Sequence, residues 1–349
     1  MHVFEAAQDF ERVVYATDPA AGLRTIVAVH STKLGPAVGG CRIQPYPDED
    51  AALRDVLRLA ESMTWKAAAA GLDLGGGKAV IIADPARDKS EALMRAFGRV
   101  VESLGGRYIT SVDVGSTTDD LDQTHKETSW VVGRSPFNGG SGDPSPITAH
   151  GVAACIRSCL HYVFRDASMA GRRIAIQGAG KVGGSLAGLL VAEGADVVVA
   201  DTSLDNVGRV VREFGVDTCP PEQILETECD VLAPCALGGV VNDETIPRMK
   251  CRIVCGSANN QLEDIRDADA LRRSGVLYAP DFIVNAGGLI SVADELTGWN
   301  RDRVMKRVED IGRTLLNVFH LAQVLNVSTA EAAVEHAKRR IRKISRLNR

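Results

Sequence analysis

A glycine pattern in the second half of the chain narrows the folds that it can adopt. Residues 178–183 read Gly-Ala-Gly-Lys-Val-Gly, directly after the apolar run 174–176 and at the start of a helical stretch. In such a strand–turn–helix unit the first glycine permits a tight turn, the second lets a pyrophosphate approach the backbone, and the third lets the helix pack on the strand. The helix N-terminus also offers unpaired N–H groups to phosphate. The alternative is a glycine-rich turn that binds nothing. We favour a dinucleotide site formed by Gly178, Ala179, Gly180, Lys181, Val182 and Gly183.

The residue that ends the next apolar run indicates which dinucleotide would bind. Asp201 follows the run 196–200, and the first arginine after it is Arg209. A carboxylate at this place accepts hydrogen bonds from the adenosine ribose hydroxyls and repels a 2′-phosphate. The pattern therefore predicts NAD rather than NADP.

Short apolar runs alternate with helical stretches throughout this half of the chain. After the runs 174–176 and 196–200, further strands are expected at 231–232, 252–254 and 276–278. Alternation of this kind predicts a parallel, doubly wound sheet. A long helix is expected over 301–326. A capping box at Ser328–Glu331 would then open a last, basic helix.

The first part of the chain mixes a strand-like run at 25–29 with a helix over 48–63. Residues 52, 53, 56, 57, 59 and 60 of that helix form one apolar face. Between the two parts, residues 136–146 are rich in Gly, Ser, Pro and Asn, and we expect a linker without regular structure there. We therefore predict an α/β protein with a cleft between two domains. These are a substrate and oligomerisation domain (1–135) and a Rossmann NAD-binding domain (136–325), with the helix of 326–349 returning to the first domain.

Charge and hydropathy exclude several classes of partner. The chain has 40 Lys and Arg against 45 Asp and Glu, a net charge of −5, so neither nucleic acid nor an anionic membrane is an expected partner. No apolar stretch reaches the roughly 20 residues that span a bilayer, and the N-terminus does not resemble a secretory signal, so we expect a cytoplasmic protein. The eight cysteines include no Cys-x-x-Cys, and we expect no metal site.

Three polar residues of the first part are candidates for a functional role. Lys78 follows three glycines, but Leu72 stands where a phosphate-binding loop would need its first glycine. We instead expect the glycines to let the backbone crowd a small ligand while Lys78 points at it. Lys66 ends the segment Met-Thr-Trp-Lys, and Asp113 follows a strand-like run. Taken singly, such lysines are usually solvated and an aspartate before a turn is usually structural.

Taken together, these segments resemble the amino-acid dehydrogenases, a family that includes the leucine, valine and phenylalanine dehydrogenases and is related to glutamate dehydrogenase. The resemblance looks closest to the leucine dehydrogenases and extends over nearly the whole chain. It rests on seven segments in the same order and spacing, namely residues 34–40, 63–66, 71–78, 113–115, 233–239, 258–261 and 285–288.

The resemblance implies reversible oxidative deamination of an L-amino acid to a 2-oxo acid and ammonia with NAD, in a homo-oligomer. By the same resemblance Lys66 would bind the substrate carboxylate, Lys78 would be the general acid/base, and Asp113 would exchange protons with the amino group. Further residues are implied to line the substrate cleft or its side-chain pocket: Gly39, Gly40, Val38, Val132, Leu289 and Val292. Others would lie near the cofactor: Thr148, Ala236, Asn260 and Asn285.

The substrate is less closely indicated than the reaction. The aliphatic wall residues favour leucine, valine and isoleucine, as in branched-chain amino-acid catabolism. Two residues depart from the leucine enzymes: Val112, where they carry an acidic residue, and Cys41, where threonine is usual. Val112 favours the alternative of an aromatic substrate, phenylalanine or tryptophan. An alternative of another class is a catalytically silent dinucleotide-binding regulatory protein, which the presence of Lys66, Lys78 and Asp113 argues against.

Overall fold

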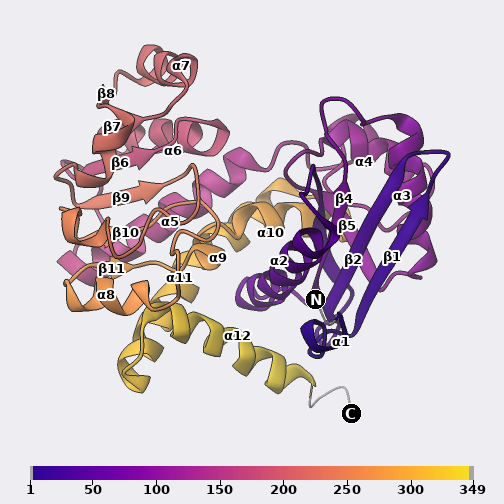
Figure 1. Ribbon diagram of the computed structural model, residues 1–349. Coiled ribbons are helices and arrows are strands. Elements are labelled where there is room, and N and C mark those ends of the chain that lie inside the picture. Colours follow the sequence, from indigo (N-terminus) through magenta and orange to yellow (C-terminus); the bar gives the residue numbers. More distant parts are fainter. Residues whose placement is uncertain (1–2, 346–349) are drawn as a thin grey trace. The chain divides into compact units, whose positions relative to one another are not determined.

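The computed structural model describes residues 3–345, which form two compact units (Figure 1). The first unit contains the chain up to Asp143, Ser291–Asn300 and the chain from Ala337 onward, and the second contains Pro144–Ile290 and Arg301–His336. The domain boundaries expected after residues 135 and 325 stay predictions. The compact units have other boundaries: residues 136–143 and 291–300 belong to the first unit, and residues 326–336 belong to the second.

The first unit is built on a mixed five-stranded sheet with the order β1-β2-β4-β3-β5. Strand β1 pairs antiparallel with β2 and β2 pairs antiparallel with β4, whereas β3 runs parallel to both β4 and β5. The elements of this part are α1 (Val3–Ala6), β1 (Arg12–Asp18), β2 (Leu23–Ser31), β3 (Ala37–Gln44), α2 (Glu49–Ala69), β4 (Gly75–Ile82), α3 (Glu91–Ser103), β5 (Tyr108–Val112) and α4 (Thr118–His125).

Helices α2 and α3 pack on opposite faces of this sheet. The predicted apolar face of α2 is buried, and it packs on β2 and β4 through residues such as Leu53, Val56 and Val80. Asp48 caps the helix by accepting a hydrogen bond from the Ala51 N–H. On the other face, α3 contributes Phe97 and other apolar residues to a second core cluster. The helix expected over 48–63 is therefore present, and it continues to Ala69.

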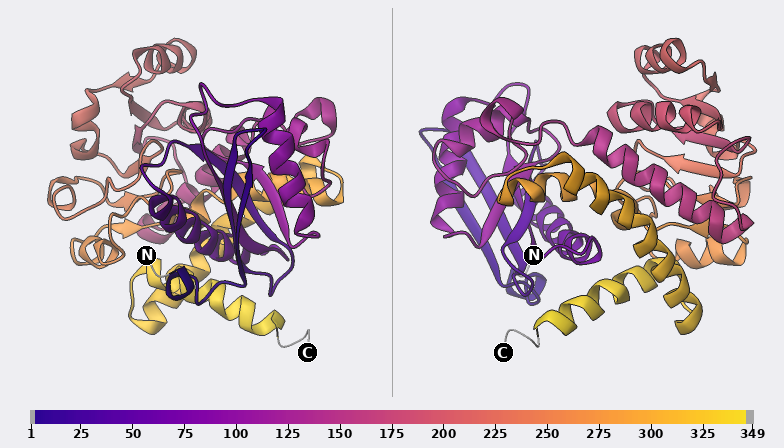
Figure 2. Two further views of the ribbon diagram at one scale, coloured as in Figure 1. Left: turned by 45° about the vertical axis from the view of Figure 1, so that its right-hand side comes forward. Right: turned by 180° about the vertical axis from the view of Figure 1, so that it is seen from behind.

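The second unit confirms the predicted doubly wound fold. Its six parallel strands have the order β11-β10-β9-β6-β7-β8, which is the Rossmann order 6-5-4-1-2-3 when the strands are counted from β6. The elements here are α5 (Ser145–Phe164), β6 (Arg173–Gln177), α6 (Lys181–Ala192), β7 (Asp196–Ala200), α7 (Leu204–Phe214), β8 (Asp217–Thr218), β9 (Val231–Pro234), β10 (Ile253–Val254), α8 (Asp267–Arg273), β11 (Leu277–Tyr278), α9 (Asp281–Val284) and α11 (Arg301–Leu325). Figure 2 shows the parallel strands of this unit from two further directions.

Two helices have residues in both units. They are α10 (Gly287–Asp294) and α12 (Thr329–Ser345). The predicted capping box opens α12: the Ser328 N–H donates to the Glu331 carboxylate, and the Glu331 N–H donates to the Ser328 hydroxyl.

The segment 136–146 is more ordered than expected. A short 3₁₀ helix occupies Pro136–Asn138, and α5 begins at Ser145 with a proline in its first turn. The expectation that no element forms there was wrong, because proline is well tolerated in the first turn of a helix, where its missing N–H would have no partner in any case.

None of the helices within residues 3–345 combines the length and the apolar character that crossing a bilayer requires. In the same part of the chain, no three His, Cys, Asp or Glu side chains lie close enough together to hold a metal ion.

Candidate active site

The three glycines before Lys78 have a different role from the one expected. They lie in strand β4, and the space where each would carry a side chain is already filled by protein. A Cβ atom on Gly75 would overlap the Ser31 carbonyl, one on Gly76 would overlap the Thr64 backbone, and one on Gly77 would lie 2.8 Å from the Tyr108 ring. The glycines therefore let α2 and neighbouring strands approach β4, rather than letting the backbone crowd a ligand.

Gly40 makes room for the central ion pair of the site. It lies on β3 and pairs in register with Ser111 of β5. A Cβ atom on Gly40 would overlap the Val112 carbonyl oxygen and would lie 2.7 Å from the Asp113 Cβ. Because Gly40 has no side chain, Asp113 can lie against β3, where its Oδ1 forms an ion pair with the Lys78 Nζ at 3.1 Å. The Lys78 side chain is only 6% exposed.

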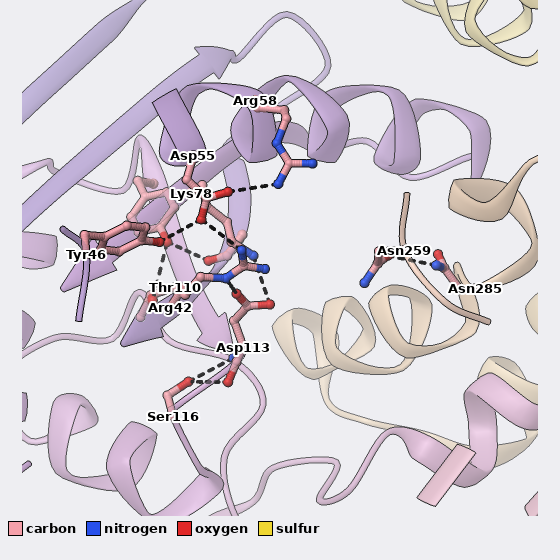
Figure 3. Close-up of polar contacts among 12 residues, drawn as sticks. Arg42, Tyr46, Asp55, Arg58, Lys78, Thr110, Asp113, Ser116, Asn259 and Asn285 are labelled. Atoms are coloured by element: carbon pink, nitrogen blue, oxygen red, sulfur yellow. Dashed lines mark hydrogen bonds and ion pairs between the residues drawn. The ribbon is translucent and has the colours of Figure 1, made fainter. Parts of the chain in front are cut away.

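Arg42 extends this pair into a chain of alternating charges (Figure 3). Its Nε donates to Asp113 Oδ2 at 2.9 Å, and its Nη1 donates to Asp55 Oδ2 at the same distance. Asp55 also accepts hydrogen bonds from the Tyr46 hydroxyl and from Arg58. Each oxygen of Asp113 therefore has one cationic partner, and the guanidinium of Arg42 is held at both sides.

The electrostatic balance keeps Asp113 ionised. Burial acts to raise the pKa of Asp113, but the nearby charges of Lys78 and Arg42 and the hydrogen bonds to them outweigh burial, and its pKa is lowered. The Ser116 hydroxyl also donates to the Asp113 carbonyl and accepts from its N–H, which holds the loop after β5 in place. A buried amine beside a fixed carboxylate can pass a proton to or from a third group that lies within hydrogen-bond distance of it.

Lys66 lies near the C-terminal end of α2 and is half-buried. The same helix carries Thr64, whose backbone packs directly against Gly76 of β4. This contact draws the end of α2 toward the strand that carries Lys78. The structure thus brings the two predicted lysines onto adjacent, tightly packed elements of one unit.

The predicted dinucleotide turn has the geometry that a pyrophosphate requires. Gly178 has a φ of 98°, which favours glycine, and a Cβ atom on Gly183 would overlap the Gly178 carbonyl. At Gly180, by contrast, nothing lies within 4 Å of the position that a Cβ atom would occupy. The turn therefore has tight packing at its first and third glycines and open space at the second, beside the N-terminus of α6. Lys181 and Val182 form the first turn of that helix.

Asp201 is fixed beside this turn. Its Oδ2 accepts a hydrogen bond of 2.7 Å from the Ala179 N–H, and its Oδ1 accepts one of 2.8 Å from the Ser203 N–H. Arg209 also contacts the turn, since its guanidinium donates to the Ala179 carbonyl. A nicotinamide dinucleotide fits this donor and acceptor set, with the ribose next to Asp201 and the phosphates next to the N-terminus of α6.

The other residues expected near the cofactor lie at separate places in the second unit, and Asn285 bonds to a residue that was not expected. The Asn285 Nδ2 donates to Asn259 Oδ1 at 2.8 Å, whereas no donor within residues 3–345 reaches the buried Oδ1 of Asn285. Thr148 packs on the start of α10, because its hydroxyl would lie 2.9 Å from a Cβ atom on Gly288. The exposed Asn260 instead accepts the Gly239 N–H through its carbonyl, so Asn259 is the asparagine bonded to Asn285. Ala236 lies against Gly178.

The expected wall residues are all buried. Val38 and Val132 are at most 1% exposed, and Val38 shares the β3 strand with Gly39 and Gly40. Val292 and Leu289 lie on α10, the former in the first unit and the latter in the second. The Gly39 carbonyl accepts a hydrogen bond from the Tyr108 hydroxyl, which holds this part of β3.

Three residues of the site were missed from the sequence: Arg42, Asp55 and Asn259. A signal for Arg42 was present, because alternate residues of a strand point to the same face and Arg42 is two residues beyond Gly40. Asp55 stands between the buried Leu53 and Val56 of α2, where an acid needs a partner. Neither of these sequence patterns indicates which residue Arg42 or Asp55 pairs with.

Two family models match the chain. One, described as "Glu/Leu/Phe/Val dehydrogenase, dimerisation domain", covers residues 10–136. The other, described as "Glutamate/Leucine/Phenylalanine/Valine dehydrogenase", covers residues 139–219 and 202–348.

Individual relatives extend over almost the full length. A leucine dehydrogenase of Bacillus cereus is 49% identical over 343 residues, which are 98% of this chain and 94% of that enzyme. A phenylalanine dehydrogenase of Lysinibacillus sphaericus is 48% identical over 336 residues, or 95% of this chain and 88% of that enzyme. The crystal structure of an L-tryptophan dehydrogenase from Nostoc punctiforme superposes with a TM-score of 0.87 at 40% identity and covers 99% of both chains.

Proposed function

This chain belongs to the glutamate/leucine/phenylalanine/valine dehydrogenase family of oxidoreductases, and we propose that it catalyses the NAD-dependent oxidative deamination of branched-chain L-amino acids. The reaction converts amino acid, water and NAD⁺ into 2-oxo acid, ammonium, NADH and a proton, and it is reversible. The observation that carries the proposal is the buried ion pair between Lys78 and Asp113. A buried amine paired with a carboxylate whose pKa its partners lower is typical of catalytic sites, which favours an enzyme over a regulatory protein without catalysis.

Four polar residues of the first unit have separate roles in this proposal. Lys66 binds the substrate carboxylate, and Asp113 exchanges protons with the substrate amino group. Lys78 is the general acid/base that activates water and protonates the leaving ammonia. Arg42 holds the Asp113 carboxylate through its Nε and is a positioning residue.

The cofactor is proposed to be NAD. A nicotinamide cofactor is expected throughout the family, and when bound it accepts the hydride of the α-carbon. The carboxylate of Asp201 supports NAD over NADP, because it lies beside the glycine turn and would repel a 2′-phosphate. Asn285 offers its unpartnered Oδ1 as an acceptor for the nicotinamide amide or for the substrate.

The substrate class rests on the four residues that the resemblance implies for the side-chain pocket, Val38, Val132, Leu289 and Val292, all of which are apolar. None of them can hydrogen-bond a polar side chain, so glutamate, aspartate and lysine would lose hydration without compensation and be rejected. Leucine, valine and isoleucine are proposed to come ahead of phenylalanine and tryptophan. The specific observation that favours an aromatic substrate instead is the apolar Val112 next to Asp113.

A substrate panel tests the proposal. We expect reduction of NAD by leucine, valine and isoleucine at alkaline pH, with a lower kcat/KM for phenylalanine and tryptophan and with NADP. A kcat/KM for an aromatic amino acid that exceeds every branched-chain value by about tenfold, the lower end of what one methylene is worth in an apolar pocket, would contradict the branched-chain assignment. No turnover with any amino acid would favour the silent dinucleotide-binding protein.

Arg42→Gln tests how Asp113 is held. Loss of one of its two cations raises the pKa of Asp113 relative to wild type, so we expect the acidic limb of the kcat/KM–pH profile to move to higher pH. Because the pKa of Asp113 is lower in the folded protein, this group stabilises the folded wild type at pH values above about 4, the pKa of the carboxyl in the unfolded chain. The stabilisation is lost as the pH falls further. At neutral pH the variant therefore gains less free energy of unfolding from this group than wild type does. Arg58→Gln is the matched control, because Arg58 pairs with Asp55 but not with Asp113. An identical pH profile in the two variants would count against this role of Arg42.

We also propose that the enzyme is a homo-oligomer. The family model that matches residues 10–136 is described as a dimerisation domain. Sedimentation of the purified protein measures the assembly directly.

A further inference from the structure

The turn between α2 and β4 connects the two proposed catalytic lysines. Helix α2 ends in a Schellman motif: the Leu72 N–H donates to the Ala67 carbonyl, the Gly71 N–H donates to the Ala68 carbonyl, and Gly71 has a φ of 73°. Lys66 lies in the last turn of α2 and Lys78 lies in the first half of β4. A shift of this turn can therefore move Lys66 relative to Lys78.

A residue far along the chain holds this turn. Arg340 of α12 donates from Nη1 to the Leu72 carbonyl at 2.7 Å and from Nη2 to the Gly71 carbonyl at 3.0 Å. Its Nη2 also donates to Asp73 Oδ1 at 2.8 Å. The Arg340 side chain is 22% exposed, whereas that of Asp73 is 79% exposed. The Leu72 carbonyl is thus the sheltered part of the contact, and the helix dipole favours a cation at this end of α2.

Helix α12 is yellow in Figures 1 and 2, and one of its side chains makes a second contact, with a ring of α2. The Lys338 Nζ lies 5.4 Å from the centroid of the Trp65 ring, within the range of a cation–π contact. Trp65 immediately precedes Lys66. Ala337 and Ile341 of the same helix are buried. The end of α2 is therefore held on either side of Lys66, at Trp65 and at residues 71–73.

We propose that Arg340 is a positioning residue that sets Lys66 relative to Lys78 for substrate binding and turnover. The proposal rests on the proposed function. A guanidinium supplies several N–H donors in one rigid plane, so one side chain can hold two carbonyls and a carboxylate at once. No other side chain of α12 is seen to donate to the 71–73 turn within the described residues.

The test compares Arg340→Gln with Arg340→Lys and with Lys343→Gln. Lys343 lies one turn further along α12, is exposed, and loses the same charge. For Arg340→Gln we expect KM for the best amino acid to rise by about tenfold and kcat to fall, because small misplacements of catalytic groups are costly. The Kd for NADH should stay within about twofold, since the glycine turn lies in the other unit. Arg340→Lys should be intermediate, and Lys343→Gln should match wild type.

Several results would overturn the inference. One is an Arg340→Gln enzyme with wild-type KM and kcat. Another is a loss of NADH binding and thermal stability in proportion to the loss of activity, which indicates a merely structural role. If Arg340→Gln does not fold, Arg340→Lys decides, because a KM equal to that of wild type then contradicts the need for a guanidinium. Wild-type protein that turns over no amino acid would contradict the proposed function itself.

Discussion

We expect Lys78→Ala to lower kcat by about 10²- to 10⁴-fold, the range for loss of a general acid/base. Within the described residues, Lys78 is the only lysine whose amine is seen to pair with Asp113, and it is buried. In the variant, no other lysine therefore pairs with Asp113 in its place. Arg42 continues to pair with Asp113 in the variant, which leaves that carboxylate with a cationic partner and favours a folded protein. NADH should bind as in wild type, because its proposed turn lies in the second unit.

The control for this experiment is Lys33→Ala, which removes an exposed lysine of the same unit and should leave kcat unchanged. Lys66→Ala provides the contrast. Loss of a carboxylate partner should act mainly on the KM of the amino acid. Equal loss of kcat in Lys66→Ala and Lys78→Ala, with KM unchanged in both, would contradict the separate roles given to the two lysines.

Gly40→Ala is expected to lower kcat by about 10²-fold, the effect of misplacing a catalytic group by about 1 Å. The backbone of Gly40 does not have a positive φ, so alanine brings no local strain there. The added Cβ atom instead meets the Val112 carbonyl and the Asp113 Cβ, and both must move away from β3. The ion pair between Lys78 and Asp113 then changes although neither residue is altered.

Steady-state kinetics with NADH binding as a second measurement separates this effect from unfolding. Gly208→Ala is the matched control: in α7 its Cβ atom meets only the flexible end of Arg212, and alanine favours a helix by about 0.5–1 kcal/mol over glycine. It should therefore be active and slightly more stable. A Gly40→Ala enzyme with wild-type kcat would show that catalysis does not depend on where Asp113 lies against β3.

The second unit could be predicted closely because its signals are local. Gly178, Gly180 and Gly183 lie within six residues. The backbone conformation, open space or close packing that makes glycine necessary at each position arises within one strand–turn–helix unit. The strands at 174–176 and 196–200 were found from short apolar runs, and their parallel order follows from the alternation with helices. The helix α5 was not predicted, since its start overlaps the segment 136–146 that was taken as a linker.

The site of the first unit could be predicted only in part. Lys66, Lys78 and Asp113 were recognised by resemblance, but the interpretation of the three glycines was wrong, because a glycine before a lysine does not reveal whether ligand or protein fills the space beside it. The links from Arg42 to Asp55 and Asp113, and from Arg340 to the 71–73 turn, join residues far apart in the chain.

The sequence by itself determined the Rossmann unit and its glycine turn, because these depend on backbone preferences within short segments. The proposed catalytic residues were indicated only by the resemblance of several segments to a known family. Only the tertiary structure decided that Asp113 has two cationic partners, that Gly40 makes room for it, and that Asn259 rather than Asn260 bonds to Asn285. The physical reason is that a charged or amide side chain takes whichever partner the packing brings within about 3 Å, and spacing along the chain does not specify that distance.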